Sequence, residues 1–197
     1  ATELKKEIGD DKDYSKDIDL LISQTKRCSE ILKKISKKQI KEDKFISSIK
    51  LEDLIEEIIL SFKETSSKDI SLIFDNDKNK INTQRSPEII YGLRNFIGNA
   101  VKFSKSKVNI ILESDEKNIE ITINDDGPGF PEDIKSVIGE PYIKSKSEEL
   151  TLNSGLGLGT FLGKTLLERK MANLSFSRDK KLGGASVSIS WKVSNIK

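Results

Sequence analysis

Three glycines alternate with leucines at residues 155–159, and an apolar pattern with helical spacing follows directly. The full run is Asn153-Ser154-Gly155-Leu156-Gly157-Leu158-Gly159-Thr160-Phe161. Glycine backbone can approach phosphate oxygens closely, and the N-terminus of the following helix adds partial positive charge. No Gly-Lys-Ser/Thr follows the glycines and no strand feeds directly into them, so the run is neither a P-loop nor a Rossmann turn. It is either a phosphate loop or a plain loop before a helix.

A helix predicted over residues 86–103 supplies a second group of polar side chains. A serine followed by a proline starts this helix in the usual way. Asn95, Asn99 and Lys102 are spaced i, i+4 and i+7, so they project from one face. Mg²⁺ accepts amide oxygens beside water and phosphates, and a lysine offsets phosphate charge. Taken alone, the three residues fit an ordinary exposed helix face equally well.

A third polar stretch, residues 125–130, follows a predicted strand and has the sequence Asp-Asp-Gly-Pro-Gly-Phe. As a ligand loop, it places the carboxylate of Asp125 at the strand end, where it can accept a hydrogen bond from an exocyclic amine. Gly127 and Gly129 leave room for a flat ring to approach the backbone. A plain turn is the alternative. Together, the three stretches predict one nucleotide pocket.

Composition restricts the chemistry of such a pocket. The 197 residues carry 34 basic and 32 acidic side chains, a net charge of +2 that does not favour nucleic acid as a partner. There is no histidine, which excludes zinc sites that need imidazole and triads that need a histidine base. A single cysteine, Cys28, rules out an internal disulfide and suits a reducing compartment. No apolar run is long enough to span a membrane, and the polar N-terminus is not a signal peptide.

Residues 1–44 predict part of a helical hairpin. Residues 1–8 resemble the end of a helix, so we expect a fragment of a longer protein, and a long helix is predicted over residues 14–41. This helix has heptad spacing at Ile18, Leu21, Thr25, Cys28, Leu32 and Ile35. A hairpin this small cannot bury its seam alone, which favours a homodimer through these helices. Packing of the long helix on the chain's own domain is the alternative.

Residues 45–197 predict one domain, a two-layer α/β sandwich. Helical spacing occurs at residues 51–62, 86–103 and from 161 onward, and strand patterns occur at 46–51, 70–74, 108–112, 119–123, 174–177 and 185–193. Adjacent strands are joined by short polar turns, which favours a mixed or largely antiparallel sheet. We expect the helices to cover one face of this sheet.

At this point the residues resemble a known family. Residues 95–103 (Asn-Phe-Ile-Gly-Asn-Ala-Val-Lys-Phe), 125–130, 155–159 and 183–185 (Gly-Gly-Ala) look like the N, G1, G2 and G3 boxes of sensor histidine kinases. These kinases belong to the GHKL superfamily, which has the Bergerat ATP-binding fold. The likeness covers residues 45–193 and is closest to redox-responsive kinases of the RegB/PrrB type. That closer likeness rests on residues 139–142, 164–169 and 27–28, which read Gly-Glu-Pro-Tyr, Lys-Thr-Leu-Leu-Glu-Arg and Arg-Cys.

The resemblance implies a protein histidine kinase with ATP and Mg²⁺ as cofactors. Asn95 and Lys102 would be the catalytic residues near the phosphates, and Asn99 would help bind the metal. Asp125 would read the adenine amino group, and residues 143–154 would form a lid. The implied nucleotide-binding set is Asn95, Asn99, Lys102, Phe103, Asp125, Gly127, Gly129, Tyr142, Lys144, Gly155, Leu156, Gly157, Leu158, Gly159 and Thr160.

The resemblance also limits the reaction. Gyrase-like, Hsp90-like and MutL-like members of the superfamily carry a glutamate where Asn95 stands. An amide cannot act as a general base, so ATP hydrolysis is disfavoured, whereas phosphoryl transfer by positioning and electrostatics stays open. The acceptor histidine is absent from this chain. The γ-phosphoryl group would pass to that missing histidine and then to a response regulator.

Cellular context follows from the resemblance alone. It implies the cytoplasmic part of a membrane-anchored kinase, with the membrane reached only through upstream segments. Cys28 would be linked to redox control through an intersubunit disulfide, against inert packing as the alternative. A nucleotide-gated binding module of the anti-sigma-factor kinase kind is a rival, which the N-terminal heptad helix argues against. A coiled-coil dimer with a degenerate pocket is a second rival, which the complete set of box residues argues against.

Overall fold

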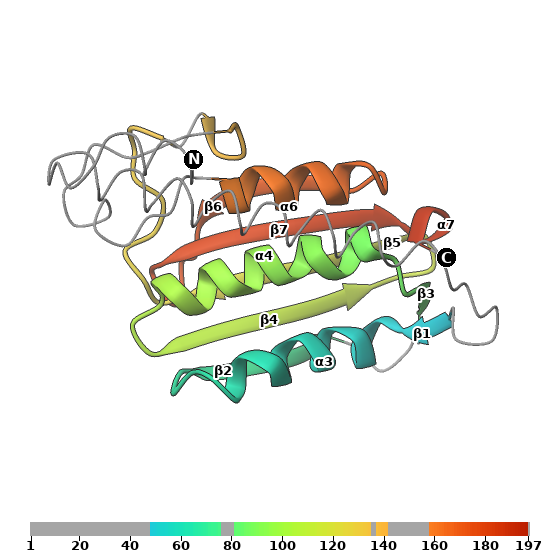
Figure 1. Ribbon diagram of the computed structural model, residues 1–197, viewed down its shortest axis with the longest axis horizontal. Coiled ribbons are helices and arrows are strands. Elements are labelled where there is room, and N and C mark those ends of the chain that lie inside the picture. Colours follow the sequence, from blue (N-terminus) through green and yellow to red (C-terminus); the bar gives the residue numbers. More distant parts are fainter. Residues whose placement is uncertain (1–47, 76–80, 135–136, 142–157, 197) are drawn as a thin grey trace, which may run out of the picture. The chain divides into compact units, whose positions relative to one another are not determined.

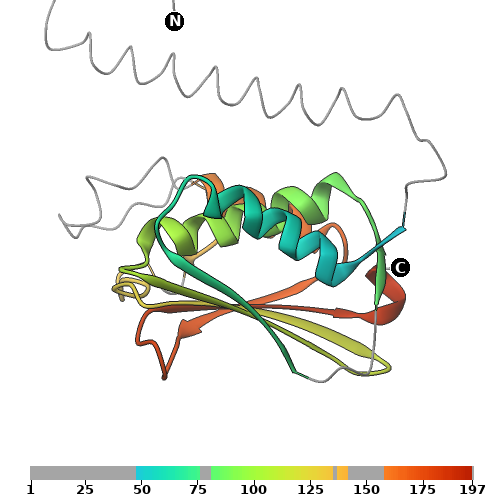
Figure 2. The same cartoon turned by 90° about the horizontal axis from the view of Figure 1, so that it is seen from below.

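The computed structural model describes residues 48–75, 81–134, 137–141 and 158–196. The predicted hairpin with Cys28 and the predicted lid lie outside these residues. In the described part, a five-stranded sheet forms one layer and three longer helices form the other. Figures 1 and 2 show all three helices on the same face of the sheet, which confirms the predicted two-layer α/β sandwich.

The sheet is mixed, as the short turns between its strands predicted. Its strand order is β2 (Asp69–Asp75), β4 (Lys107–Ser114), β5 (Asn118–Asp125), β7 (Ala185–Lys192) and β6 (Asn173–Arg178). Only β2 and β4 pair in parallel, and the other neighbours are antiparallel. The tight turn between β4 and β5 is stabilised by the Asp115 carboxylate, which accepts backbone hydrogen bonds from Lys117 at 2.6 Å and Asn118 at 2.7 Å.

Two small elements were not predicted from the sequence. One is β3 (Asn82–Gln84), a three-residue strand that pairs with β1 (Ser48–Lys50) outside the main sheet. β1 itself is the strand predicted near residue 48. The other is α7 (Val193–Ile196), which begins where the last strand was expected to end. The buried hydroxyl of Thr83 donates to the carbonyl of Ile196 at 2.8 Å and so joins the two.

Two of the three longer helices have nearly the predicted bounds, whereas the third begins three residues before its predicted start at 161, so Gly159 and Thr160 lie in its first turn. In chain order, the three helices are α3 (Leu51–Lys63), α4 (Pro87–Phe103) and α6 (Leu158–Glu168). At the start of α4, the Ser86 hydroxyl accepts a hydrogen bond from the backbone N–H of Ile89 at 3.1 Å, as expected of a cap residue before proline. Among the described residues, no helix has both the length and the apolar character needed to cross a lipid bilayer.

Alternation along the strands sends every second side chain toward the helix layer. The buried rows on the three central strands are Val108, Ile110 and Leu112; Ile119, Ile121 and Ile123; and Val187, Ile189 and Trp191. Asp125 continues the row of β5 two residues beyond Ile123, and it is only 4% exposed. The pleat of β5 therefore places a carboxylate on the inner face, at the end of an otherwise apolar row.

Two glycines inside helices bring α4 and α6 close together. A β-carbon at Gly92 of α4 would lie 2.5 Å from Leu167 Cγ, and one at Gly163 of α6 would lie 3.0 Å from Phe96 Cε2. Glycine in a helix interior is destabilising by about 0.5–1 kcal/mol relative to alanine, so these positions are not explained by helix propensity. Close packing explains them, and we call the contact formed at Gly92 and Gly163 the glycine seam.

Candidate nucleotide-binding site

The amide side chains of α4 face the first turn of α6. Asn95 donates its Nδ2 to the carbonyl of Tyr91 on its own helix at 2.7 Å, and its Oδ1 faces α6. A β-carbon at Gly159 would lie 3.5 Å from that oxygen and 3.9 Å from Oδ1 of Asn99. Asn99 donates its Nδ2 to the Thr160 hydroxyl at 3.2 Å. Two neutral oxygen atoms therefore flank one helix N-terminus.

This arrangement suits a metal ion bound together with phosphate. Amide oxygens are acceptable Mg²⁺ ligands, and the N–H groups of a first helical turn favour anions. The structure brings four of the predicted site residues together, Asn95, Asn99, Gly159 and Thr160, and Leu158 is the first residue of α6. The remaining predicted glycine-loop and lid residues, Tyr142, Lys144, Gly155, Leu156 and Gly157, lie outside the described residues.

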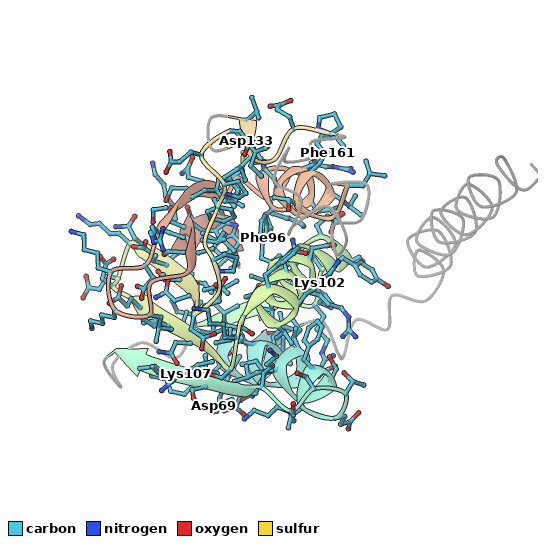
Figure 3. The ribbon with its side chains drawn as sticks, turned by 90° about the vertical axis from the view of Figure 1, so that its left-hand side faces the viewer. Asp69, Phe96, Lys102, Lys107, Asp133 and Phe161 are labelled. Carbon is cyan, nitrogen blue, oxygen red and sulfur yellow. The ribbon has the colours of Figure 1, made fainter. Side chains whose placement is uncertain are left out.

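Lys102 lies on the last turn of α4 and is exposed. Figure 3 shows it on the outer side of the helix, whereas Phe96 points into the interior. The Lys102 ammonium lies 5.2 Å from the ring centroid of Phe103, a cation–π distance. A cation near a helix C-terminus is also favourable in itself. These contacts account for Lys102 without a phosphate, and they leave its charge open to solvent.

The buried carboxylate of Asp125 is held by backbone N–H groups. Its Oδ1 accepts from Gly127 at 2.8 Å and from Ala185, at the start of β7, at 3.1 Å. Burial raises the pKa of Asp125 above its usual value, although these two hydrogen bonds act in the opposite direction. The side chain is thus a fixed acceptor at the inner edge of the sheet, which suits recognition of an amino group.

The glycines around Asp125 are needed for the protein's own packing. A β-carbon at Gly184 would lie 2.2 Å from the Asp125 carbonyl oxygen and 2.3 Å from its Oδ1. At Gly127, a β-carbon would lie 2.4 Å from the carbonyl oxygen of Phe103, at the end of α4. Contacts within the chain therefore leave no room for a side chain at Gly127. Gly129, with φ of +82°, has a backbone conformation that favours glycine.

Asp126, next to this buried acceptor, ties the loop to the turn that follows α4. Its carboxylate accepts hydrogen bonds from the backbone N–H groups of Lys105 at 2.8 Å and Ser106 at 3.0 Å, and from the Ser106 hydroxyl at 2.7 Å. Burial acts to raise the pKa of Asp126, but these bonds outweigh it and hold the pKa far below its usual value. Lys68 fixes the same turn by donating to the carbonyls of Ser104 and Lys105.

Three aromatic rings join the two halves of the site. Phe176 of β6 lies 6.0 Å from Phe96 of α4 and 5.8 Å from Phe130, which follows the Asp125 loop, between ring centroids. The second pair meets edge to face, a favourable geometry for aromatic rings. The loop and the amide helix are therefore connected through one apolar cluster on the inner face.

Sequence reasoning missed the structural roles of Asp126, Gly92, Gly163 and Gly184. Gly163 follows Gly159 by four residues, so both fall on one helix face, a signal of close helix contact that the sequence does contain. Asp126 had no comparable signal, because its partners lie 20 and 21 residues away. The role of Asp126 is therefore identified only by the assembled fold.

Comparisons with known proteins identify the family and the fold. Residues 85–195 match the family described as histidine kinase-, DNA gyrase B-, and HSP90-like ATPase. Sensor histidine kinase RegB of Cereibacter sphaeroides is 33% identical over 185 residues, which cover 90% of this chain and 40% of RegB. The chain thus spans well under half of the length of that relative.

Two solved structures share the fold. The mycobacterial sensor histidine kinase MprB aligns with a TM-score of 0.61 at 17% identity, over 75% of this chain and 97% of that one. Full-length ShkA in complex with AMPPNP aligns with a TM-score of 0.61 at 20% identity, over 74% of this chain and 30% of ShkA. The chain therefore belongs to the histidine kinase-, DNA gyrase B- and HSP90-like ATPase family, and its fold is that of sensor histidine kinase catalytic domains.

Proposed function

We propose that this chain supplies the ATP-binding catalytic domain of a two-component sensor histidine kinase, an ATP-dependent phosphotransferase. One observation carries the proposal: the amide oxygens of Asn95 and Asn99 face the first turn of α6. The buried Asp125 acceptor supports it from the neighbouring strand end. The match to RegB and the nucleotide complex of ShkA agree with this assignment.

Each residue has a chemical role in this proposal. Asn99 is a ligand of Mg²⁺, and Asn95 lies beside it near the phosphates. Lys102 offsets phosphate charge from the end of α4, and the first turn of α6 donates N–H groups to phosphate oxygens. Asp125 accepts a hydrogen bond from the adenine amino group.

The same residues favour transfer over hydrolysis. The Asn95 amide has no lone pair basic enough to take a proton from water, so it does not activate water as a nucleophile. Positioning and charge neutralisation remain, and they suffice for phosphoryl transfer when an acceptor is presented. In the proposed reaction, that acceptor is a histidine outside this chain, and a response regulator receives the phosphoryl group next.

Calorimetry with ADP, with and without Mg²⁺, tests the site directly. The unmutated chain should bind, Asn99→Ala should lose most of the Mg²⁺ dependence, and Asp125→Ala should lose affinity in both conditions. Asn173→Ala is a matched control, because Asn173 is an exposed amide on β6. Absence of binding by the unmutated chain would overturn the proposal.

A second experiment separates kinase from binding module. A longer protein that includes the acceptor histidine should form an acid-labile phosphoprotein from labelled ATP. Nucleotide binding without any phosphoprotein would support the rival function, a nucleotide-gated binding module.

Residues 1–44 have a separate role in the proposal, as the end of a dimerisation hairpin in the cytoplasmic part of a membrane-anchored kinase. Cys28 would then face its counterpart and form an intersubunit disulfide under oxidation. Oxidised protein should run as a dimer on a non-reducing gel, and Cys28→Ala should not. A monomer band from the unmutated protein under strong oxidant would contradict the disulfide.

A further inference from the structure

Helices α4 and α6 lie side by side (Figure 1). Their described contacts fall at three successive levels. Gly92 meets Leu167, Gly163 meets Asn95 and Phe96, and Asn99 meets Thr160. Residue numbers rise along α4 while they fall along α6, so the two helices are antiparallel. The glycine seam and the amide contacts of the site are therefore consecutive levels of one helix interface.

At the middle level of the interface, Gly163 lies directly against the site residue Asn95. A β-carbon at Gly163 would lie 3.1 Å from Cβ of Asn95 and 3.4 Å from the carbonyl oxygen of Gly92. A methyl group there would push against the atom that carries the Asn95 amide. One turn earlier on α6, Gly159 faces the two amide oxygens, and the Thr160 hydroxyl accepts a hydrogen bond from Nδ2 of Asn99. A change in helix separation at Gly163 therefore moves the amides relative to the first turn of α6.

We propose that Gly92 and Gly163 are positioning residues for metal–nucleotide binding. By holding α4 and α6 in close contact, they set the distance between the Asn95 and Asn99 amides and the first turn of α6. The inference rests on the proposed function, because it concerns the Mg²⁺-dependent part of nucleotide affinity. Mg²⁺ demands near-ideal octahedral geometry, so a small displacement of its ligands is felt.

Gly98, which lies on α4 as Gly92 does, provides a matched control. A β-carbon at Gly98 would lie 3.1 Å from Cζ and 3.3 Å from Cε1 of Phe62, on α3. The nearest distance, 3.1 Å, is similar to the 3.0 Å at Gly163, but the contact is with α3 and not between α4 and α6. Phe62 in turn lies under the Arg94 guanidinium, 5.0 Å from ring centroid to Cζ, away from the site. Both glycine-to-alanine changes add the same helix propensity.

The test measures ADP affinity by calorimetry, with and without Mg²⁺, and thermal unfolding of each variant. Gly163→Ala should bind ADP about tenfold more weakly in Mg²⁺, with a much smaller change without the metal. Gly98→Ala should bind as the unmutated chain does. Unchanged Mg²⁺-dependent affinity of Gly163→Ala, or an equal loss in Gly98→Ala, overturns this inference alone. Absence of binding by the unmutated chain overturns the proposed function as well.

A compensating pair covers the case in which Gly163→Ala fails to fold. The three nearest atoms to a β-carbon at Gly92 all belong to the Leu167 side chain, at 2.5, 2.6 and 3.2 Å. Gly92→Ala should therefore weaken Mg²⁺-dependent binding, and Gly92→Ala with Leu167→Ala should recover it, because truncation of Leu167 restores the space. A purely structural role predicts that the double variant is worse than either single one. A double variant that stays as weak as Gly92→Ala contradicts the proposal.

Discussion

Between α4 and α6, two helix glycines let side chains approach, and the contacts at those two glycines are steric. Around Asp125 and Asp126, by contrast, two carboxylates accept backbone hydrogen bonds, and glycine is needed because polar atoms crowd together. On the helix side, the nearest atom to each added β-carbon belongs to a side chain, Leu167 or Phe96, whereas at Gly127 and Gly184 it is a backbone carbonyl oxygen, which can adjust less. We therefore expect changes on the loop side to be the more damaging.

Gly184→Ala should give the largest effect. Its added β-carbon would overlap the carbonyl oxygen of Asp125, at 2.2 Å, and backbone cannot rotate away as a side chain can. We expect a loss of about 2–3 kcal/mol in the free energy of unfolding and no detectable ADP binding. Urea unfolding followed by fluorescence of the single tryptophan, Trp191, measures the first quantity.

Its neighbour is the control. Gly183 has φ of +80° but no atom within 4 Å of an added β-carbon, so Gly183→Ala bears conformational strain without a clash. It should lose about 1–2 kcal/mol and keep ADP binding. If Gly183→Ala abolishes ADP binding as completely as Gly184→Ala does, a steric clash with Asp125 does not explain why ADP binding needs glycine at position 184.

Asp126→Ala should have an intermediate effect that depends on pH. The variant loses the hydrogen bonds from Lys105 and Ser106, about 1–2 kcal/mol at neutral pH. Because the folded pKa of Asp126 lies below its usual value of 3.8, its contribution is present above that value and fades as the pH falls further. The gap in unfolding free energy between the unmutated chain and Asp126→Ala should therefore narrow in acid.

Asp125→Asn should change the pH dependence of the free energy of unfolding in the opposite direction. Burial raises the folded pKa of Asp125 above its usual value of 3.8, so ionisation of this group weakens the folded state as the pH rises through the folded pKa. Asp125→Asn should abolish that decline. Urea unfolding at several pH values gives the pH dependence of the free energy of unfolding for the unmutated chain and for each variant. If Asp125→Asn and Asp126→Ala change this pH dependence in the same direction, the contrast between the two neighbours is contradicted.

Arg85→Ala should give the smallest effect and leave the site untouched. Arg85 forms a two-point ion pair with Glu57 of α3, at 2.7 and 3.3 Å. The side chains are 37% and 57% exposed, so solvent screens the pair. We expect a loss of about 0.5 kcal/mol, further reduced by salt, with ADP affinity unchanged. A fall in ADP affinity would show that α3 influences the site.

The same contrast explains what the sequence reveals. Start signals such as Ser86 before proline, and alternation such as Ile119, Ile121 and Ile123, are local, so they predict elements of the fold. Asn95 and Asn99 are predictable because helical spacing alone puts them on one face. The contacts of Asp126 and Gly184 join segments that are distant in the chain, and β3 has only three residues, too few for a period. Periodicity cannot report either kind of feature.

Asp125 and Asp126 are chemically identical, yet one carboxylate is buried beneath the helix layer and the other binds an exposed turn. Asp125 is the last residue of β5 and continues the inward row of Ile119, Ile121 and Ile123, whereas Asp126 lies just beyond the strand. A shift of β5 by one residue against β4 would turn Asp125 and the isoleucine row outward together. The position of the acceptor is therefore tied to the apolar core. A register that misplaces the Asp125 carboxylate also exposes Ile119, Ile121 and Ile123 to solvent.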